Sequence, residues 1–164
     1  MSELFLYDVI GEDILGEGLS ARTIRDELNQ VERGDDVLLR INSPGGDVFE
    51  AEAIVSLLSD YRVSARIDGV AASAASYIAA HAETVEISDG GFYMIHNPWT
   101  ITVGDAAEHA RTEQLLEKLS VLLLGEPELV EYLRVTGPVQ HVLVAVRRRG
   151  HVARPRACGN AAVD

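Results

Sequence analysis

The chain has 164 residues, 47% of them hydrophobic, with one cysteine and a formal net charge of −12 at pH 7. This length suits one hydrophobic core rather than two full domains, and the lone Cys158 excludes an internal disulfide and a multi-cysteine zinc site, as in a reducing compartment. The acidity argues against nucleic-acid and anionic-membrane binding. Without an apolar run of roughly 18 residues or a leader-like start, we expect a soluble, cytoplasmic protein.

The chain alternates between short β-like runs and helical stretches up to about residue 124. Short runs rich in apolar and β-branched residues predict strands, and apolar residues three or four apart predict helices. In chain order we expect strand 4–7, helix 21–30, strand 37–41, helix 48–58, strand 63–67, a turn at 68–69, helix 73–82, strands 84–87 and 92–95, and helix 105–123. Strands that alternate with helices predict an α/β domain with largely parallel pairing.

The composition changes near Gly125. Residues 1–124 hold 22 acidic and 8 basic residues, whereas residues 125–164 hold 4 acidic and 6 basic ones. Prolines, glycines and an arginine run at 147–149 also interrupt the pattern there. We therefore predict a domain at 1–124 and a divergent, poorly ordered segment at 125–164.

Residues 41–47, with the sequence INSPGGD, join an apolar strand to a helix. Gly45 and Gly46 allow the backbone to expose N–H groups that a Cβ would crowd, so this turn could bind an anion or an oxyanion. A purely structural turn, with Asp47 as the helix cap, fits the same residues.

Two serines lie at the start of the alanine-rich helix. Ser73 is the better candidate nucleophile because it lies nearest the turn, where the first helical N–H groups remain unpaired and could stabilise an oxyanion. Ser76 would lie one turn inside the helix. Either serine could instead cap the helix or bond back to its own backbone.

His96 closes an apolar strand just before an Asn-Pro loop. An imidazole at a strand end could overhang a cleft and take the proton of a serine, although a structural histidine fits the pattern as well. His81 has only its place at a helix end in its favour, and His109 is expected on a solvated helix face. His96 is therefore the candidate general base.

Together these segments resemble the ClpP family of serine peptidases and, within it, the ClpP-related head-maturation proteases of phages and prophages. The matching stretches are INSPGGDVFEA at 41–51, DGVAASAASYIAA at 68–80 and FYMIHNPWT at 92–100, with LYD near the start. These motifs agree in order and spacing over about residues 4–124. The resemblance implies an α/β fold of the ClpP/crotonase-like ββα spiral type.

The resemblance also implies catalytic roles. Ser73 matches the family's nucleophile and His96 its general base. The backbone N–H groups of Gly46 and Ala74 match its oxyanion hole, a role that agrees with the physical interpretation of both turns.

Substrate and partners follow from the same resemblance. Gly45, Gly46 and Val70 match positions that bind a polypeptide substrate as an added β-strand. The helix at 105–123 resembles the family's handle helix, so we expect a homo-oligomeric ring. No cofactor or metal is implied. The chain has no Gly-Lys-Ser/Thr loop, so any ATP dependence would come from a separate unfoldase, and capsid proteins are the alternative partners.

The chain departs from the family where the third catalytic residue is expected. The resemblance implies an aspartate near Ala145, but no Asp or Glu occurs between Arg134 and Val163. A frameshifted or truncated gene would produce such a change of sequence. Three outcomes are open without this aspartate. Ser73 and His96 could act as a weak dyad, the protein could be inactive, or another carboxylate could take the place of the aspartate. The candidates for that carboxylate are Asp89, Asp105, Asp164 and a residue of another subunit.

Two further functions remain open from the sequence. Acyl-CoA hydratases and isomerases use the same fold, and their oxyanion hole polarises a thioester without a serine nucleophile. A catalytically inactive ring or capsid-assembly component is the other alternative.

Overall fold

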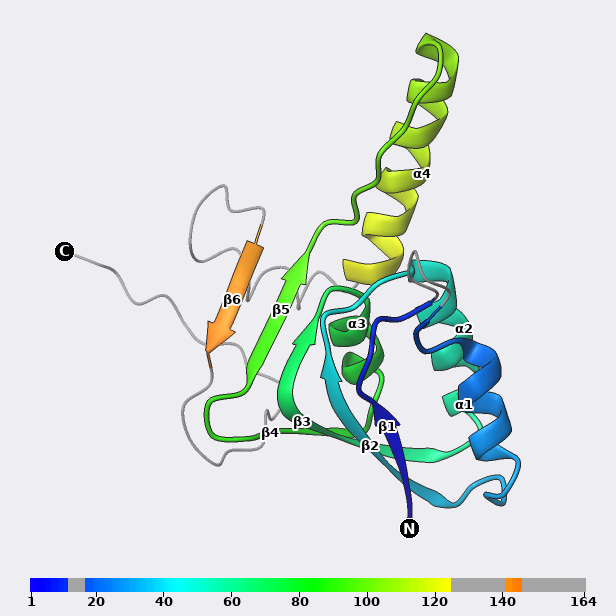
Figure 1. Cartoon of the computed structure of the whole chain (residues 1–164), viewed down its shortest axis with the longest axis vertical. Coiled ribbons are helices and arrows are strands. Elements are labelled where there is room, and N and C mark those ends of the chain that lie inside the picture. The colour runs from blue at the N-terminus through cyan, green and yellow to red at the C-terminus, as the bar shows by residue number, and fades with distance from the viewer. Residues whose placement is uncertain (12–16, 125–140, 146–164) are drawn as a thin grey trace, which may run out of the picture.

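A computed structural model describes residues 1–11, 17–124 and 141–145 of the chain (Figure 1). Its elements, in chain order, are β1 (Ser2–Leu6), α1 (Ala21–Leu28), β2 (Asp36–Ser43), α2 (Val48–Leu58), β3 (Arg62–Ala72), α3 (Ala74–Ala80), β4 (Thr84–Ile87), β5 (Phe92–His96), α4 (Ala106–Leu124) and β6 (His141–Ala145). The predicted divergent segment falls mostly on residues 125–140 and 146–164, which lie outside the described residues together with Asp164.

The strands form one sheet in the order β1-β2-β3-β5-β6, with β4 also paired to β3. The pairs β1–β2, β2–β3, β3–β4 and β3–β5 are parallel, and only β5–β6 is antiparallel among the described pairs. The predicted α/β class and the largely parallel pairing are therefore confirmed. Strand β6 is not predicted by the sequence pattern.

Helices α1, α2 and α3 cover one face of the sheet (Figure 1). Alternate residues of β1, β2 and β3 point into this layer and are buried, as the period-two geometry of strands requires. The side chains that fill it most completely are Leu6, Ile10, Ile24, Leu39, Ile41, Ile54, Ile67 and Ile78. This single core holds the ends of β2, β3 and β5 in fixed relative positions.

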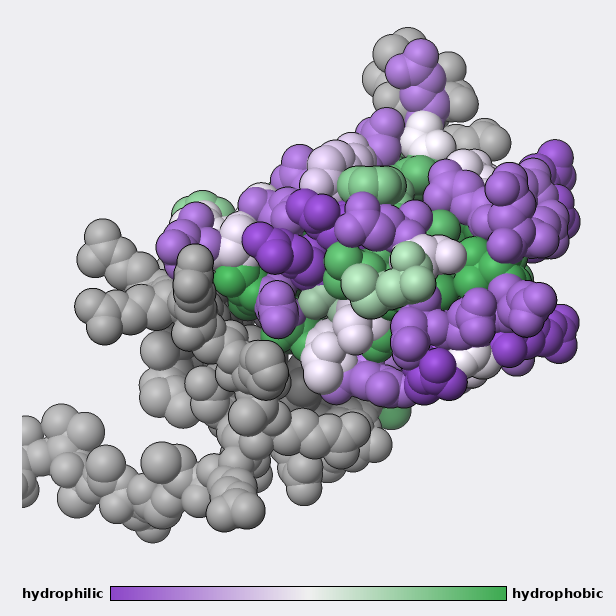
Figure 2. Space-filling model, turned by 90° about the horizontal axis from the view of Figure 1, so that it is seen from below, coloured by the Kyte–Doolittle hydropathy of each residue, from purple (hydrophilic) through white to green (hydrophobic). Residues whose placement is uncertain are grey.

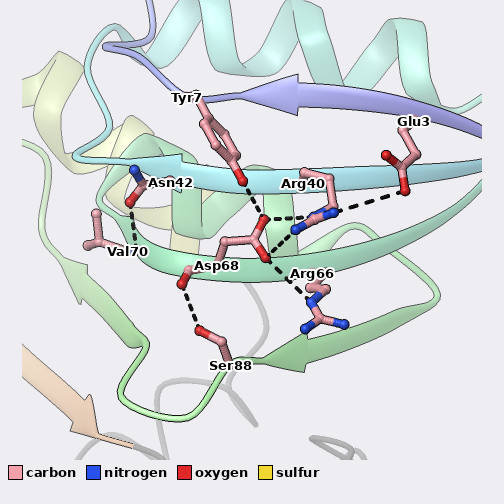
Figure 3. Close-up of polar contacts among 8 residues, drawn as sticks. All are labelled: Glu3, Tyr7, Arg40, Asn42, Arg66, Asp68, Val70 and Ser88. Carbon is pink, nitrogen blue, oxygen red and sulfur yellow. Dashed lines mark hydrogen bonds and ion pairs between the residues drawn. The ribbon is translucent and has the colours of Figure 1, made fainter.

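The opposite face of β1, β2 and β3 carries mainly polar and charged side chains, and Figure 2 shows how hydrophilic and hydrophobic residues mix on the underside of the molecule. The Asp68 carboxylate accepts hydrogen bonds from Arg40 Nε and Nη2, each at 2.7 Å, and from the Tyr7 hydroxyl at 2.7 Å (Figure 3). Arg66 Nε lies 3.4 Å from the same carboxylate. We call these four residues, Tyr7, Arg40, Arg66 and Asp68, the Asp68 cluster.

Strand β3 corrects the prediction of a turn at Asp68-Gly69. The strand continues through both residues to Ala72, with a shift in its register against β2. The glycine signal marks this irregularity inside a strand rather than the end of the strand. The prediction was wrong because a local breaker pattern cannot reveal a bulge that a neighbouring strand supports.

Beyond β5 the chain forms an arm. Residues 97–105 run outward beside α4, which returns toward the body (Figure 1), and the Thr112 hydroxyl meets the Thr102 hydroxyl at 3.4 Å between the two. Trp99, Ile101 and Val103 are 70%, 83% and 92% exposed.

Over the described residues, no helix combines the length and apolarity that crossing a membrane requires.

Candidate active site

Ser73 occupies the single residue between β3 and α3, in a backbone conformation that side chains disfavour. Its φ is 53° and its ψ −124°, and it is the only non-glycine residue with positive φ in the described part of the chain. Such a conformation costs on the order of 1–3 kcal/mol and persists only where the surroundings enforce it. The core therefore imposes this turn on Ser73.

The two serines of α3 have different roles. The Ser76 side chain is buried, and its hydroxyl donates to the Ser73 carbonyl oxygen at 2.6 Å, which is the structural back-bond that the sequence allowed. Ser73 stands at the N-cap position, yet its hydroxyl does not cap the helix. Within the described residues that hydroxyl makes no hydrogen bond, and it is only partly buried. Helix capping therefore does not explain why a serine is present at position 73.

The Pro-Gly-Gly turn at residues 44–46, the glycine turn, lies directly against Ser73. A Cβ placed on Gly45, whose φ is +91°, would come within 2.7 Å of Ser73 Cβ and 2.9 Å of the Ala74 nitrogen. A Cβ on Gly46, with φ of +150°, would overlap the Ile10 carbonyl oxygen. Both positions thus need glycine, for backbone conformation and for close approach. The structure brings together two turns that are separated by 27 residues in the sequence.

Two backbone N–H groups at these turns have no acceptor among the described residues. Gly46 forms a parallel bridge with Ile10 through the N–H of Ile10 and the N–H of Asp47, so its own N–H points away from Ile10. Ala74 is the first residue of α3, where intrahelical acceptors are missing. Unpaired N–H groups beside a serine are what an oxyanion hole needs.

His96 is the last residue of β5, the strand next to Ser73. The Ser73 N–H donates to the Met94 carbonyl oxygen at 2.9 Å, which fixes the serine beside β5 two residues before the histidine. His96 is partly buried and stands opposite His141 of β6 in the antiparallel register. Ser73 and His96 therefore lie at the ends of adjacent parallel strands.

Val70 lies inside the sheet rather than at a free edge. It pairs with Phe92 of β5, and its N–H donates to the Asn42 side chain at 3.2 Å (Figure 3). Strand addition needs backbone groups that no neighbour has taken. The Val70 N–H is thus taken by Asn42, whereas the Gly46 N–H of the neighbouring turn has no acceptor among the described residues.

Tyr93 links β5 to α3, the helix that begins directly after Ser73. Its hydroxyl donates to the Ser76 carbonyl oxygen at 2.7 Å, and burial raises the pKa of this phenol. Burial also raises the pKa of Tyr77, whose hydroxyl donates to the Glu52 carboxylate of α2. Both tyrosines remain neutral donors at neutral pH and hold α3 between β5 and α2.

The candidate carboxylates lie away from His96 where they are described. Asp105 Oδ1 accepts the N–H groups of Ala107 and Glu108 at 2.9 and 3.0 Å, so it caps α4 at the outer end of the arm. Asp89 is exposed in the turn before β5, at the opposite end of that strand from His96. Over residues 1–11, 17–124 and 141–145, no three His, Cys, Asp or Glu side chains are grouped to hold a metal ion.

Comparison with protein families places this geometry in a known context. A model of the Clp protease family matches residues 19–124, from just before α1 to the end of α4. The chain belongs to the Clp protease family. The mixed α/β fold with its parallel sheet agrees with a Clp protease, as the sequence resemblance implied. A comparison with curated proteins gives no match. The matched range includes Ser73, His96 and the glycine turn, and it ends at residue 124.

Proposed function

We propose that this Clp protease family member is a serine endopeptidase in which Ser73 attacks the peptide carbonyl and His96 accepts the serine proton. The N–H groups of Gly46 and Ala74 then stabilise the oxyanion, and His96 returns the proton to the leaving amine. The peptide backbone docks along Gly45 and Gly46, where the Gly46 N–H has no acceptor among the described residues.

The conformation of Ser73 carries this proposal. Its backbone is strained, its hydroxyl does not cap α3, and Gly45 packs within van der Waals reach of it. A serine with a structural role would use its hydroxyl, as Ser76 does. Strain of this kind gathers at active sites, where it holds a reactive group in place.

The sequence predicts that activity is reduced. In serine proteases, replacing the carboxylate that orients the histidine lowers turnover by about 10⁴-fold, while the oxyanion hole still acts. The part of the chain where the family supplies this aspartate contains no acid. We therefore propose slow acylation of Ser73 that a reactive probe detects more readily than a peptide substrate does.

A fluorophosphonate probe tests the proposal on the full chain. The parent protein should be labelled, and peptide mapping should place the adduct on Ser73. Ser73→Ala should abolish labelling without lowering thermal stability, because the Ser73 hydroxyl makes no bond within the described residues.

Ser76→Ala is the matched control. It removes a buried hydrogen bond three residues away and should cost about 1 kcal/mol of unfolding free energy while labelling continues. Equal labelling of the parent and Ser73→Ala would contradict the assignment of Ser73. An assembled but unlabelled parent would favour an inactive ring component or an acyl-CoA-binding protein.

We also propose that the arm mediates assembly into a homo-oligomeric ring. Trp99, Ile101 and Val103 are largely exposed along one extended segment, and such an apolar stretch is unfavourable in water. The particle mass of the purified protein tests this, and replacing all three by serine should yield the monomer. A monomeric parent would contradict ring formation.

The subgroup is a finer part of the proposal. The INSPGGDVFEA and FYMIHNPWT segments resemble head-maturation proteases of phages and prophages, which would make capsid proteins the substrates. Genes for portal and capsid proteins beside this gene would support that role. A gene for an ATP-dependent unfoldase beside it would favour regulated proteolysis instead.

A further inference from the structure

Strands β2 and β3 change their register just before Ser73. Ile41 is paired with Ile67, and the next paired residue of β2, Ser43, lies opposite Ala71. Asn42 alone therefore stands opposite three residues of β3, at positions 68–70. A bulge of this kind interrupts the backbone ladder and leaves backbone groups in need of other partners.

The Asn42 side chain bonds this bulge to β2. Its Oδ1 accepts the Val70 N–H at 3.2 Å, and Figure 3 shows the amide turned toward β3. Gly69 makes the approach possible, because a Cβ at this position would overlap Asn42 Oδ1. The amide oxygen of Asn42 thus replaces a backbone acceptor that the shifted ladder does not supply.

The flanking segments are held independently of Asn42. At the first residue of the bulge, the Asp68 carbonyl oxygen accepts the Ser88 hydroxyl at 2.7 Å, and the Asp68 carboxylate is bound in the Asp68 cluster. After the bulge, Ala71 and Ala72 pair with β5. The length of chain stored in the bulge decides how far the end of β3 reaches toward the glycine turn.

We propose that Asn42 is a positioning residue for the nucleophile. By fixing Val70, it sets the offset of β3 against β2 and holds Ser73 in its close contact with Gly45. Asn42 lies on the outer face of the sheet and does not touch the reacting atoms. This role rests on the proposed function of Ser73.

Catalytic geometry is sensitive to such an offset. A misplacement of about 1 Å can lower a reaction rate by about 10²-fold. Because β5 still restrains Ser73 when Asn42 is truncated, we expect a smaller loss of about tenfold. The loss should fall on the rate of acylation rather than on binding of the probe.

Saturation kinetics of fluorophosphonate labelling on the full chain test this expectation. Asn42→Ala should lower the maximal labelling rate about tenfold and leave the half-saturating probe concentration within about twofold. Asn42→Asp keeps an acceptor oxygen and should restore most of the rate. Ser64→Ala is the control, because it removes another side-chain hydrogen bond of β3, to Thr84 at 3.1 Å, and should label at the parent rate.

Amide hydrogen exchange gives a second readout that does not depend on activity. Asn42→Ala should speed exchange at Val70 and leave residues 37–41 unchanged. If Asn42→Ala labels at the parent rate, or Val70 exchange is unaltered, Asn42 does not position Ser73, and the proposed function survives. If the parent is not labelled at Ser73, the proposed function fails and takes the catalytic role of Asn42 with it.

Discussion

Two polar regions lie five residues apart, at Asp68 within β3 and at Ser73 just after it, and they are built in opposite ways. Around Asp68 the polar side chains are paired with one another: the carboxylate has bidentate Arg40 on one side and Tyr7 on another (Figure 3). At Ser73 the backbone is strained, and the hydroxyl has no partner in the described part of the chain. The first arrangement favours stability, and the second keeps groups available for another molecule.

The contrast separates structural from functional polar residues without reference to any relative. Paired groups with relaxed geometry need no further explanation, because satisfied hydrogen bonds are the rule in folded proteins. The strained backbone of Ser73, together with its hydroxyl and the adjacent N–H groups, which have no partner among the described residues, does need an explanation. Mutations around Asp68 should therefore change stability, and mutations around Ser73 should change chemistry.

Among variants that keep Ser73, the largest effect is expected from Gly45→Ala. The new Cβ would lie 2.7 Å from Ser73 Cβ and 2.9 Å from the Ala74 nitrogen, so the serine turn and the glycine turn must move apart. A shift of about 1 Å lowers a reaction rate by about 10²-fold, and we expect a loss of this size in fluorophosphonate labelling of Ser73.

Gly34→Ala is the matched control for the backbone effect. Gly34 has φ of +85°, close to that of Gly45, but no atom lies within 4 Å of its added Cβ. This variant should lose about 1 kcal/mol of stability from the left-handed conformation and keep its labelling rate. Equal loss of labelling in both variants would mean that global stability, not the contact with Ser73, controls the chemistry.

Asp68→Asn should have an intermediate effect, on stability alone. The hydrogen bonds from Arg40, aided by that from Tyr7, hold the pKa of Asp68 below its ordinary value although burial opposes the shift. The stabilisation is therefore fully present above an unfolded-state pKa of about 3.9 and is lost as pH falls through the lower folded-state pKa. At pH 7 we expect Asp68→Asn to cost about 2 kcal/mol, more than one neutral hydrogen bond but less than the sum of three charged ones, because water still reaches these side chains.

Thermal unfolding from pH 7 to pH 3 checks this pH dependence. The difference between the parent and Asp68→Asn should be largest near neutrality and shrink below about pH 4. Asp36→Asn is the control: Asp36 contacts Arg62 at 2.8 Å, but both side chains are more than half exposed, so its loss should matter less. A difference that grows in acid would show that the sign assigned to Asp68 is wrong.

Most of the fold could be predicted from the sequence because its strands and helices carry strong periodic patterns. The pattern predicts the strand at 84–87 with its observed bounds, and the helical spacing from Val48 to Leu58 predicts the helix α2 that the structure contains. The region after Ile67 could not be predicted, because the continuation of β3 depends on Asn42 of a neighbouring strand. Local patterns contain no information about a hydrogen bond between residues 28 positions apart.

The candidate site was predicted in part for a similar reason. The glycines and Ser73 stood out as turn residues, but their contact with each other depends on the parallel packing of β2 against β3. The sequence pattern marks Asn42 only as part of a turn, although an amide next to a Pro-Gly-Gly turn is a residue type that bonds to backbone groups. The difference between Ser73 and Ser76 required the hydrogen bonds of the folded chain.

The smallest effect is expected from Tyr93→Phe, because Tyr93, like the residues around Asp68, has its hydrogen-bond partner within the chain. The variant removes the hydrogen bond from the Tyr93 hydroxyl to the Ser76 carbonyl oxygen and should cost about 1 kcal/mol, or about 2–4 °C in Tm. Tyr61→Phe is the control, because the Tyr61 hydroxyl makes no hydrogen bond among the described residues.

Alkaline pH sharpens this last prediction. Burial raises the pKa of Tyr93, so its contribution to stability is fully present below the ordinary phenol pKa of about 10 and is lost as pH rises through the higher folded-state pKa. The gap in Tm between the parent and Tyr93→Phe should therefore narrow above about pH 10, while Ser73 labelling at neutral pH stays close to that of the parent. A large loss of labelling in Tyr93→Phe would instead make this hydrogen-bonded tyrosine part of the reactive region and would break the division between paired structural groups and the groups around Ser73.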